Sequence, residues 1–158
     1  MVISALILIL SSAFFFFYLQ ATCQRILRHE FDREYCLAIV NANLLEFPAV
    51  RRTLGDMNAP MDYPRLQIKL KCDFLALTYL LKNTANVNQR CSLRERLLMA
   101  YFRLVFASVT TRHWLRLHEE PAILKLTVIL QYFANVVGQR MDTVAFTNLI
   151  ASDSALDS

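Results

Sequence analysis

Glycine and proline are scarce in this chain, which has 2 glycines and 4 prolines among 158 residues. Sandwiches and barrels of short strands need these residues at most of their turns, so an all-β fold is not expected. Charged residues are also sparse, at 19%, whereas 56% of the residues are apolar. This composition excludes collagen-like, low-complexity and disordered chains. We therefore expect an all-α protein, with one transmembrane helix followed by a cytoplasmic bundle of about four helices.

The sequence also lacks the short motifs of common catalytic and cofactor sites. It contains no GxSxG, P-loop, dinucleotide-binding or CxxCH pattern. None of the four cysteines forms a CxxC pair, and the segment 28–34, rich in carboxylates and holding one histidine, matches no zinc or di-iron template. We expect neither a catalytic residue, nor a metal site, nor a cofactor. The cysteines are interpreted as free thiols of a reducing compartment.

The longest uncharged stretch lies at the start of the chain. Residues 2–19 carry no charge, and the first charged side chain is Arg25. Because about 20 apolar residues cross a ~30 Å hydrocarbon core, residues 1–23 are predicted to be a transmembrane anchor. A cleaved signal peptide is the main alternative. It would have a basic residue before the run and a small-x-small site after it, whereas bulky aromatics occupy positions 14–18 here. A buried soluble helix is the other alternative.

Arginines follow the apolar run, and no lysine or arginine precedes it. Arg25, Arg28 and Arg33 come directly after it. Positive residues favour the cytoplasmic side, so we expect a single-pass plasma-membrane protein with its N-terminus outside and its C-terminal domain in the cytoplasm. Together with Arg51 and Arg52, these arginines are predicted to contact anionic lipid headgroups at the membrane surface. Nucleic acid is not an expected partner, because no binding motif or dense basic patch is present.

Residues 24–141 are predicted to form the helical bundle domain. Its first helix is expected to continue from the anchor to about Phe47, where Pro48 would end it. Three prolines and a glycine mark 48–64 as the main connection. Pro64, with Asp62 as a possible N-cap, then opens a helix that ends at 82 or 83.

That second helix has a regular apolar stripe and, on the predicted wet face, Lys69 and Asp73. The stripe consists of Leu66, Leu70, Phe74, Leu77 and Leu81. Ser92 and Glu95 form a capping box that opens a helix to about position 119. Pro121 starts the last long helix, which Gly138 is expected to close. Residues 142–158 are predicted to be a short, partly disordered tail.

The last two predicted helices are apolar around most of their circumference. A four-helix core buries one seam of each helix, so part of this surface should be left for a partner. Aromatic side chains beside arginine dominate protein interfaces. The predicted partner-binding residues are Tyr101, Phe102, Phe106, Trp114, Tyr132 and Phe133. We expect a membrane-anchored interaction module, an accessory or scaffold subunit that docks on other subunits of a membrane complex or on a second copy of itself.

The alternative function is a membrane-bound carrier or enzyme with a pocket for a lipid or hydrophobic cofactor. Such a pocket would contain an ionisable group, and Arg103 and Lys125 are the best candidates. The simpler interpretation is that both side chains snorkel to solvent or pair with carboxylates. A further alternative is that the two late helices enter the membrane as a hairpin, although their uncharged runs are too short to span it.

Overall fold

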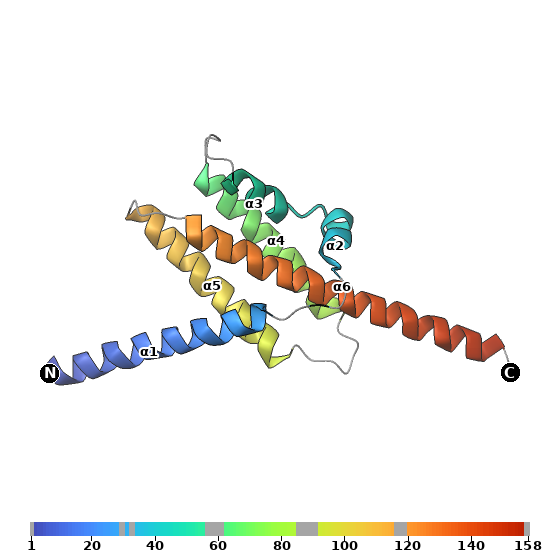
Figure 1. Cartoon of the computed structure of the whole chain (residues 1–158), viewed down its shortest axis with the longest axis horizontal. Coiled ribbons are helices and arrows are strands. Elements are labelled where there is room, and N and C mark those ends of the chain that lie inside the picture. The colour runs from blue at the N-terminus through green and yellow to red at the C-terminus, as the bar shows by residue number, and fades with distance from the viewer. Residues whose placement is uncertain are drawn as a thin grey trace.

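In the computed structural model, residues 2–28, 31, 34–55, 62–84, 92–115 and 120–156 are described. Over these residues the chain forms six α-helices and no strand (Figure 1). The helices are α1 (Val2–Leu27), α2 (Cys36–Asn43), α3 (Phe47–Gly55), α4 (Tyr63–Asn83), α5 (Leu93–Trp114) and α6 (Glu120–Leu156). The predicted all-α class is confirmed.

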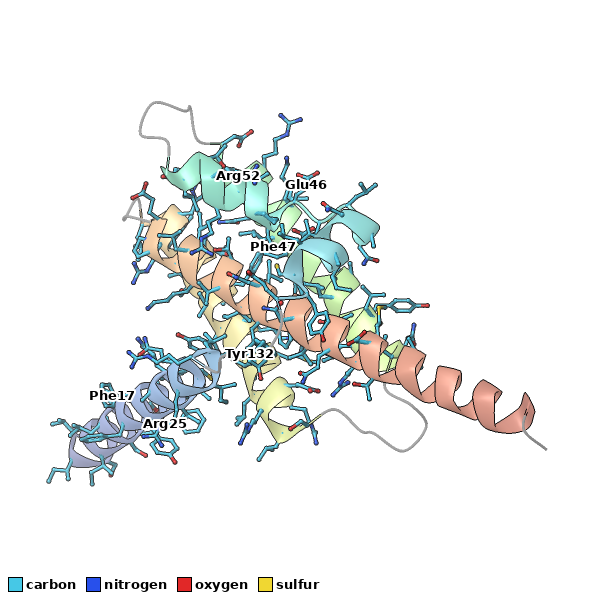
Figure 2. The ribbon with its side chains drawn as sticks, turned by 45° about the vertical axis from the view of Figure 1, so that its right-hand side comes forward. Phe17, Arg25, Glu46, Phe47, Arg52 and Tyr132 are labelled. Carbon is cyan, nitrogen blue, oxygen red and sulfur yellow. The ribbon has the colours of Figure 1, made fainter. Side chains whose placement is uncertain are left out.

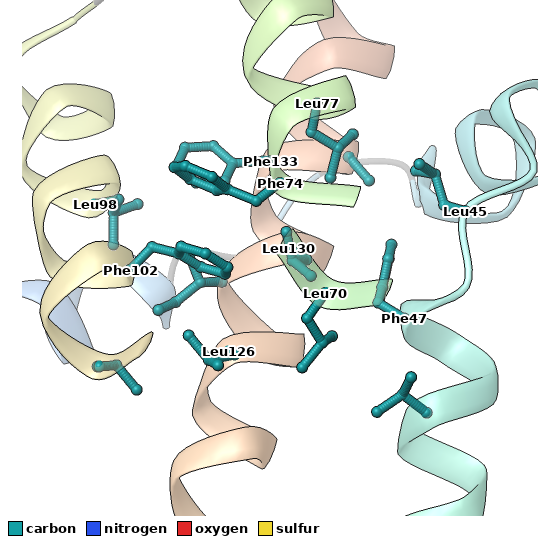
Figure 3. Packing of buried hydrophobic residues seen from close by; sticks show 14 of the residues in the cluster. Leu45, Phe47, Leu70, Phe74, Leu77, Leu98, Phe102, Leu126, Leu130 and Phe133 are labelled. Atoms are coloured by element: carbon teal, nitrogen blue, oxygen red, sulfur yellow. The ribbon is translucent and has the colours of Figure 1, made fainter. Parts of the chain in front are cut away.

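The central element of the bundle is α6. It packs against α2, α3, α4 and α5, and Figure 1 shows it running through the middle of the bundle. Phe74 of α4 stacks on Phe102 of α5 with the ring centroids 4.0 Å apart, and Phe133 of α6 lies 6.2 Å from Phe74 (Figure 3). Burying each aromatic side chain removes roughly 150–250 Å² from water, and this triad joins α4, α5 and α6.

In the part of the chain that the structure describes, two helices are long and apolar enough to cross a membrane, α1 and the first part of α6. Their surroundings differ, because 67% of the most apolar stretch of α6 is buried within the protein, against 6% of that of α1. The apolar residues of α6 are therefore explained by the core. Those of α1 are exposed, and Figure 1 shows α1 projecting from the bundle toward the N-terminus.

The segment after α1 differs from the prediction. A single helix to Phe47 was expected, but α1 ends at Leu27 and α2 and α3 are separate short helices. Leu44 ends α2 in the left-handed conformation, with φ at 51°. Pro48 lies in the first turn of α3 instead of ending a helix. A proline fits there, because the first amide groups of a helix have no intrahelical acceptor.

A carboxylate of α4 holds the start of α3. Oδ2 of Asp73 accepts hydrogen bonds from the amide groups of Glu46, at 2.9 Å, and Phe47, at 2.6 Å. Lys69 of α4 forms an ion pair with Glu46. Asp73 is 5% exposed, so its predicted place on the wet face is wrong. A buried carboxylate is tolerated here because it satisfies two free helical donors.

The starts of the later helices agree with the sequence signals. Asp62 is the N-cap of α4, and Pro64 lies in the first turn. Leu70, Phe74, Leu77 and Leu81 are buried, and Leu66 is partly buried against them. The capping box of α5 is present, with the Ser92 amide donating to Glu95 Oε2 at 3.0 Å. Pro121 lies in the first turn of α6.

The end of α6 is a second departure from the prediction. The helix continues through Gly138 to Leu156, so Gly138 does not close it, and the segment expected to be a tail from 142 is helical as far as 156. A side chain at 138 would overlap Cβ of Tyr35 and approach its Cγ to 2.9 Å. Glycine is present because the segment before α2 crosses α6 closely at this point. The hydroxyl of Tyr35 donates to Asp142 Oδ2 at 3.0 Å one turn further on.

Candidate functional site

The five predicted membrane-surface arginines are not brought together. Arg25 and Arg28 are exposed at the end of α1, next to its apolar surface. Arg51 and Arg52 are exposed on α3, which packs on α4 and α6, and Figure 2 shows Arg52 far from Arg25. Arg51 donates to Gln131 Oε1 at 2.9 Å. Arg33 lies outside the described residues. Of the described arginines in this set, Arg25 and Arg28 are thus the two that adjoin the exposed apolar surface of α1.

The six predicted partner-binding aromatics also separate into different environments. Tyr101, Phe102 and Phe133 are between 1% and 6% exposed and belong to the core, so they form no docking surface. Phe106 and Tyr132 are partly buried against that core. Trp114 is 85% exposed at the end of α5. Large aromatic residues pack equally well inside and at interfaces, which is why composition alone did not separate them.

Burial also changes the chemistry of several described side chains. It raises the pKa of the Tyr101 hydroxyl, and it raises the pKa of the Cys36 thiol to about 11. A thiol with this pKa is almost entirely protonated at neutral pH and reacts slowly. Cys72 of α4, in contrast, is exposed. Among the described residues, no group of three histidine, cysteine or carboxylate side chains is placed to hold a metal ion.

A cavity of about 390 Å³ lies between α1, α5 and α6. Phe16 and Leu19 of α1 and Leu104 and Val105 of α5 supply apolar walls. Arg112 of α5 and Lys125 of α6 bring two positive charges to the same cavity. Cavities of roughly 300–1,000 Å³ are typical of small-molecule sites.

Lys125 was one of two sequence candidates for a pocket cation, although snorkelling to solvent or pairing was the simpler interpretation. It lines the cavity, and it is exposed. Arg103, the other candidate, is exposed and is not among the lining residues. Arg112 was not among the pocket candidates, and its place in the cavity depends on the packing of α5 against α1. That contact joins segments far apart in the sequence, and no local pattern indicated it.

A second feature is an apolar stripe on the outer face of α4, which we call the α4 outer stripe. It consists of Ile68, Cys72, Leu75 and Tyr79. Ile68, Leu75 and Tyr79 are 64%, 57% and 67% exposed, although they are spaced like core residues. At 100° per residue, the stripe lies nearly opposite the buried stripe that includes Leu70 and Leu77. This face was not predicted, although the helical spacing of Ile68, Cys72, Leu75 and Tyr79 is visible in the sequence.

The spacing of the α4 outer stripe is that of a coiled-coil seam. Its steps of four, three and four residues match alternating d and a positions of a heptad. Arg65 flanks the stripe on one side, and Lys71 and Lys82 flank it on the other. Asp73 is the one acidic residue of α4, and its side chain is buried against the start of α3. The outer face of α4 is therefore apolar at its centre and basic at its edges.

The fold and these two features define an all-α protein with an exposed apolar N-terminal helix and a compact helical bundle. No protein-family model, curated protein or solved structure matches the chain.

Proposed function

We propose that this protein is a membrane-anchored helical interaction module. In this proposal α1 crosses the plasma membrane with its N-terminus outside, and the bundle lies on the cytoplasmic side. There the bundle binds an amphipathic helix of another subunit along the α4 outer stripe. The observation that carries the proposal is the stripe itself, because residues spaced as a helix-packing seam are exposed opposite a complete core.

Charge identifies the kind of helix that fits. Arg65, Lys71 and Lys82 flank the α4 outer stripe, so a partner helix with glutamate or aspartate beside its apolar seam is attracted. A second copy of the same stripe would bring like charges together, which disfavours a homodimer through this face. The proposed occupant is therefore an acidic amphipathic helix.

Peptide binding tests the docking face directly. The full chain in mild non-ionic detergent is titrated with a three-heptad designed helix that has leucine at a and d and glutamate at e and g. The comparison peptide carries lysine at e and g. We expect the acidic peptide to bind and the basic one not to bind. Equal binding of both peptides, or of neither, would refute the proposed charge selection.

A pair of matched variants assigns the binding to α4. Burying a leucine contributes about 1.5–3 kcal/mol, so Leu75→Ser should weaken the acidic peptide by about 10- to 100-fold. Leu37→Ser, at another exposed leucine, on α2, is the control and should leave the affinity unchanged. An equal loss in both variants would show that the peptide binds elsewhere.

Thiol protection gives an independent readout at the centre of the stripe. In a Cys91→Ser background, the exposed Cys72 should react with a maleimide, and saturating acidic peptide should slow this reaction. Cys36 has a raised pKa and is buried, so it should contribute little to the signal. An unchanged rate at Cys72 under saturating peptide would place the binding site on another face.

The membrane anchor and its orientation need a separate test. A reporter active only in the cytoplasm, fused after Ser158, should be active, and the protein should resist carbonate extraction with residues 1–23 still attached. Loss of these residues during maturation would identify α1 as a cleaved signal sequence. Activity of a reporter restricted to the outside would reverse the orientation.

A further inference from the structure

The cavity between α1, α5 and α6 lies at a defined depth along α1. Its wall includes Phe16, Leu19 and Gln20. With a rise of 1.5 Å per residue, Gln20 is roughly 26 Å along the helix from Ile3. The hydrocarbon core is ~30 Å thick, so these residues would lie where the acyl chains meet the headgroups of one leaflet. This inference shares with the proposed function the insertion of α1, and it does not depend on docking at α4.

The lining of the cavity has two chemical characters. On the α1 side Phe16 and Leu19 supply apolar surface, and Phe16 is 51% exposed, so that side of the cavity adjoins the surface α1 would present to lipid. Toward the α5–α6 end it contains Arg112 and Lys125. Ser108 and Gln20 add uncharged polar groups. An apolar wall next to two cations is complementary to a molecule with a hydrocarbon chain and an anionic head.

We propose that this cavity binds one anionic phospholipid of the membrane, with its phosphate held between Arg112 and Lys125 and the upper part of an acyl chain against Phe16, Leu19 and Leu104. An arginine offers a planar fork of donors to phosphate oxygens, and a lysine adds a compact charge. The bound lipid would also contact α1, α5 and α6 at once. It would therefore fix the anchor against the bundle.

Native mass spectrometry of the full chain in non-ionic detergent tests this site. The probes are phosphatidylglycerol, phosphatidylcholine and glycerol phosphate, which has the phosphate without acyl chains. We expect one phosphatidylglycerol to be retained per chain, with weaker binding of phosphatidylcholine and none of glycerol phosphate. Equal binding of the two lipids would overturn the assignment to an anionic headgroup. Glycerol phosphate binding as tightly as phosphatidylglycerol would show a site for free phosphate instead.

Removing the two charges should weaken the lipid complex. A basic residue near a membrane surface contributes roughly a fivefold factor, so Arg112→Gln/Lys125→Gln should bind phosphatidylglycerol about 30-fold more weakly. The control, Arg94→Gln/Arg96→Gln, removes two exposed charges in the first turn of α5, and neither residue lines the cavity. An equal loss in the control would reduce the effect to general attraction and overturn the site.

Filling the cavity provides a test that keeps every charge. Ser108→Phe places a ring where the acyl chain is proposed to lie and should abolish retention of phosphatidylglycerol. Thr110→Phe, on an exposed face of α5 and not among the lining residues, should leave it unchanged. Helical circular dichroism of both variants verifies folding. Full retention of the lipid by a folded Ser108→Phe protein would refute the proposal, while binding of acidic peptide at α4 would be unaffected either way.

Discussion

Replacing Asp73 by alanine should destabilise the bundle far more than replacing it by asparagine. Asp73 Oδ2 accepts both amide hydrogen bonds at the start of α3, from Glu46 and Phe47. Because both bonds reach one oxygen, the amide oxygen of asparagine can accept both of them. Alanine accepts neither, so the Asp73→Ala protein would have a buried donor without an acceptor.

The size of the loss follows from the burial of the two donors. The Phe47 hydrogen bond is buried, and an unsatisfied buried donor costs about 1–3 kcal/mol. The Glu46 bond is partly buried, so water recovers part of it, and losing a typical N-cap costs about 1 kcal/mol. We expect Asp73→Ala to lose about 2–3 kcal/mol and Asp73→Asn less than about 1 kcal/mol. For a chain of this length, the alanine variant should melt roughly 4–12 °C lower.

The pH dependence separates hydrogen bonding from charge. Burial raises the pKa of the Asp73 carboxyl above its ordinary value of 3.8, and hydrogen bonds from the Phe47 and Glu46 amides oppose the shift only in part. The native state then binds the proton more tightly than the unfolded state. The stability of wild type relative to Asp73→Asn should therefore be greatest below the ordinary pKa, fall as the pH rises through the raised pKa, and then level off.

Unfolding of the full chain in non-ionic detergent, followed by far-UV circular dichroism between pH 3 and 8, measures both effects. Asp73→Asn as unstable as Asp73→Ala would refute the reasoning, because it would make the negative charge, and not the acceptor oxygen, the stabilising feature. A relative stability that rises with pH would show that hydrogen bonding outweighs desolvation.

Three further measurements test other parts of the bundle. In Gly138→Ala, helix propensity stabilises α6 by about 1 kcal/mol, but the overlap with Tyr35 pushes the start of α2 away from α6 and costs about 1–3 kcal/mol. The melting temperature of Gly138→Ala should therefore fall, whereas that of the control Gln139→Ala, at an exposed position, should not. Arg140 donates to Glu95 Oε1 at 2.6 Å, and the Glu95 side chain is 7% exposed. Arg140→Met should therefore lose about 3 kcal/mol in denaturant unfolding, and adding Glu95→Gln should restore part of it; no restoration would refute a charge effect. Trp114 is the one tryptophan of the chain and is 85% exposed at the end of α5. In vesicles, phospholipids brominated near the headgroup should quench its fluorescence. Unquenched emission typical of water would place the end of α5 away from the membrane.

Local signals in the sequence predicted the helices whose starts depend on neighbouring residues. The N-cap at Asp62 and the capping box at Ser92 each act within four residues, so both were readable. Pro48 was ambiguous, because a proline fits equally after one helix and at the start of the next. Asp73, on another helix, decides between these alternatives by capping α3. Long-range capping of this kind leaves no local pattern.

The same limit applies to the candidate sites. Phe102 and Trp114 both looked like interface aromatics, and only the packing of α5 on α4 and α6 separates the buried ring from the exposed one. The α4 outer stripe, in contrast, was available from periodicity, since α4 has apolar positions on two opposite faces. One stripe was sufficient to explain a bundle helix, and the second was overlooked for that reason.

The contrast between α1 and α6 shows why the apolar surface of α1 needs an environment outside the chain. Both helices pass the same test of length and hydropathy, but α6 is mostly covered by four other helices. Among the described core residues, Cys23 is the one fully buried side chain that α1 contributes, whereas Phe14, Phe15 and Phe17 are 63–72% exposed. Moving each such side chain from water into an apolar medium is favourable by about 1.5–3 kcal/mol. The bundle provides little of this medium, because α1 contacts α5 and α6 mainly through its C-terminal half. Most of α1 therefore needs an apolar environment outside the bundle, and in the proposed function the membrane supplies it.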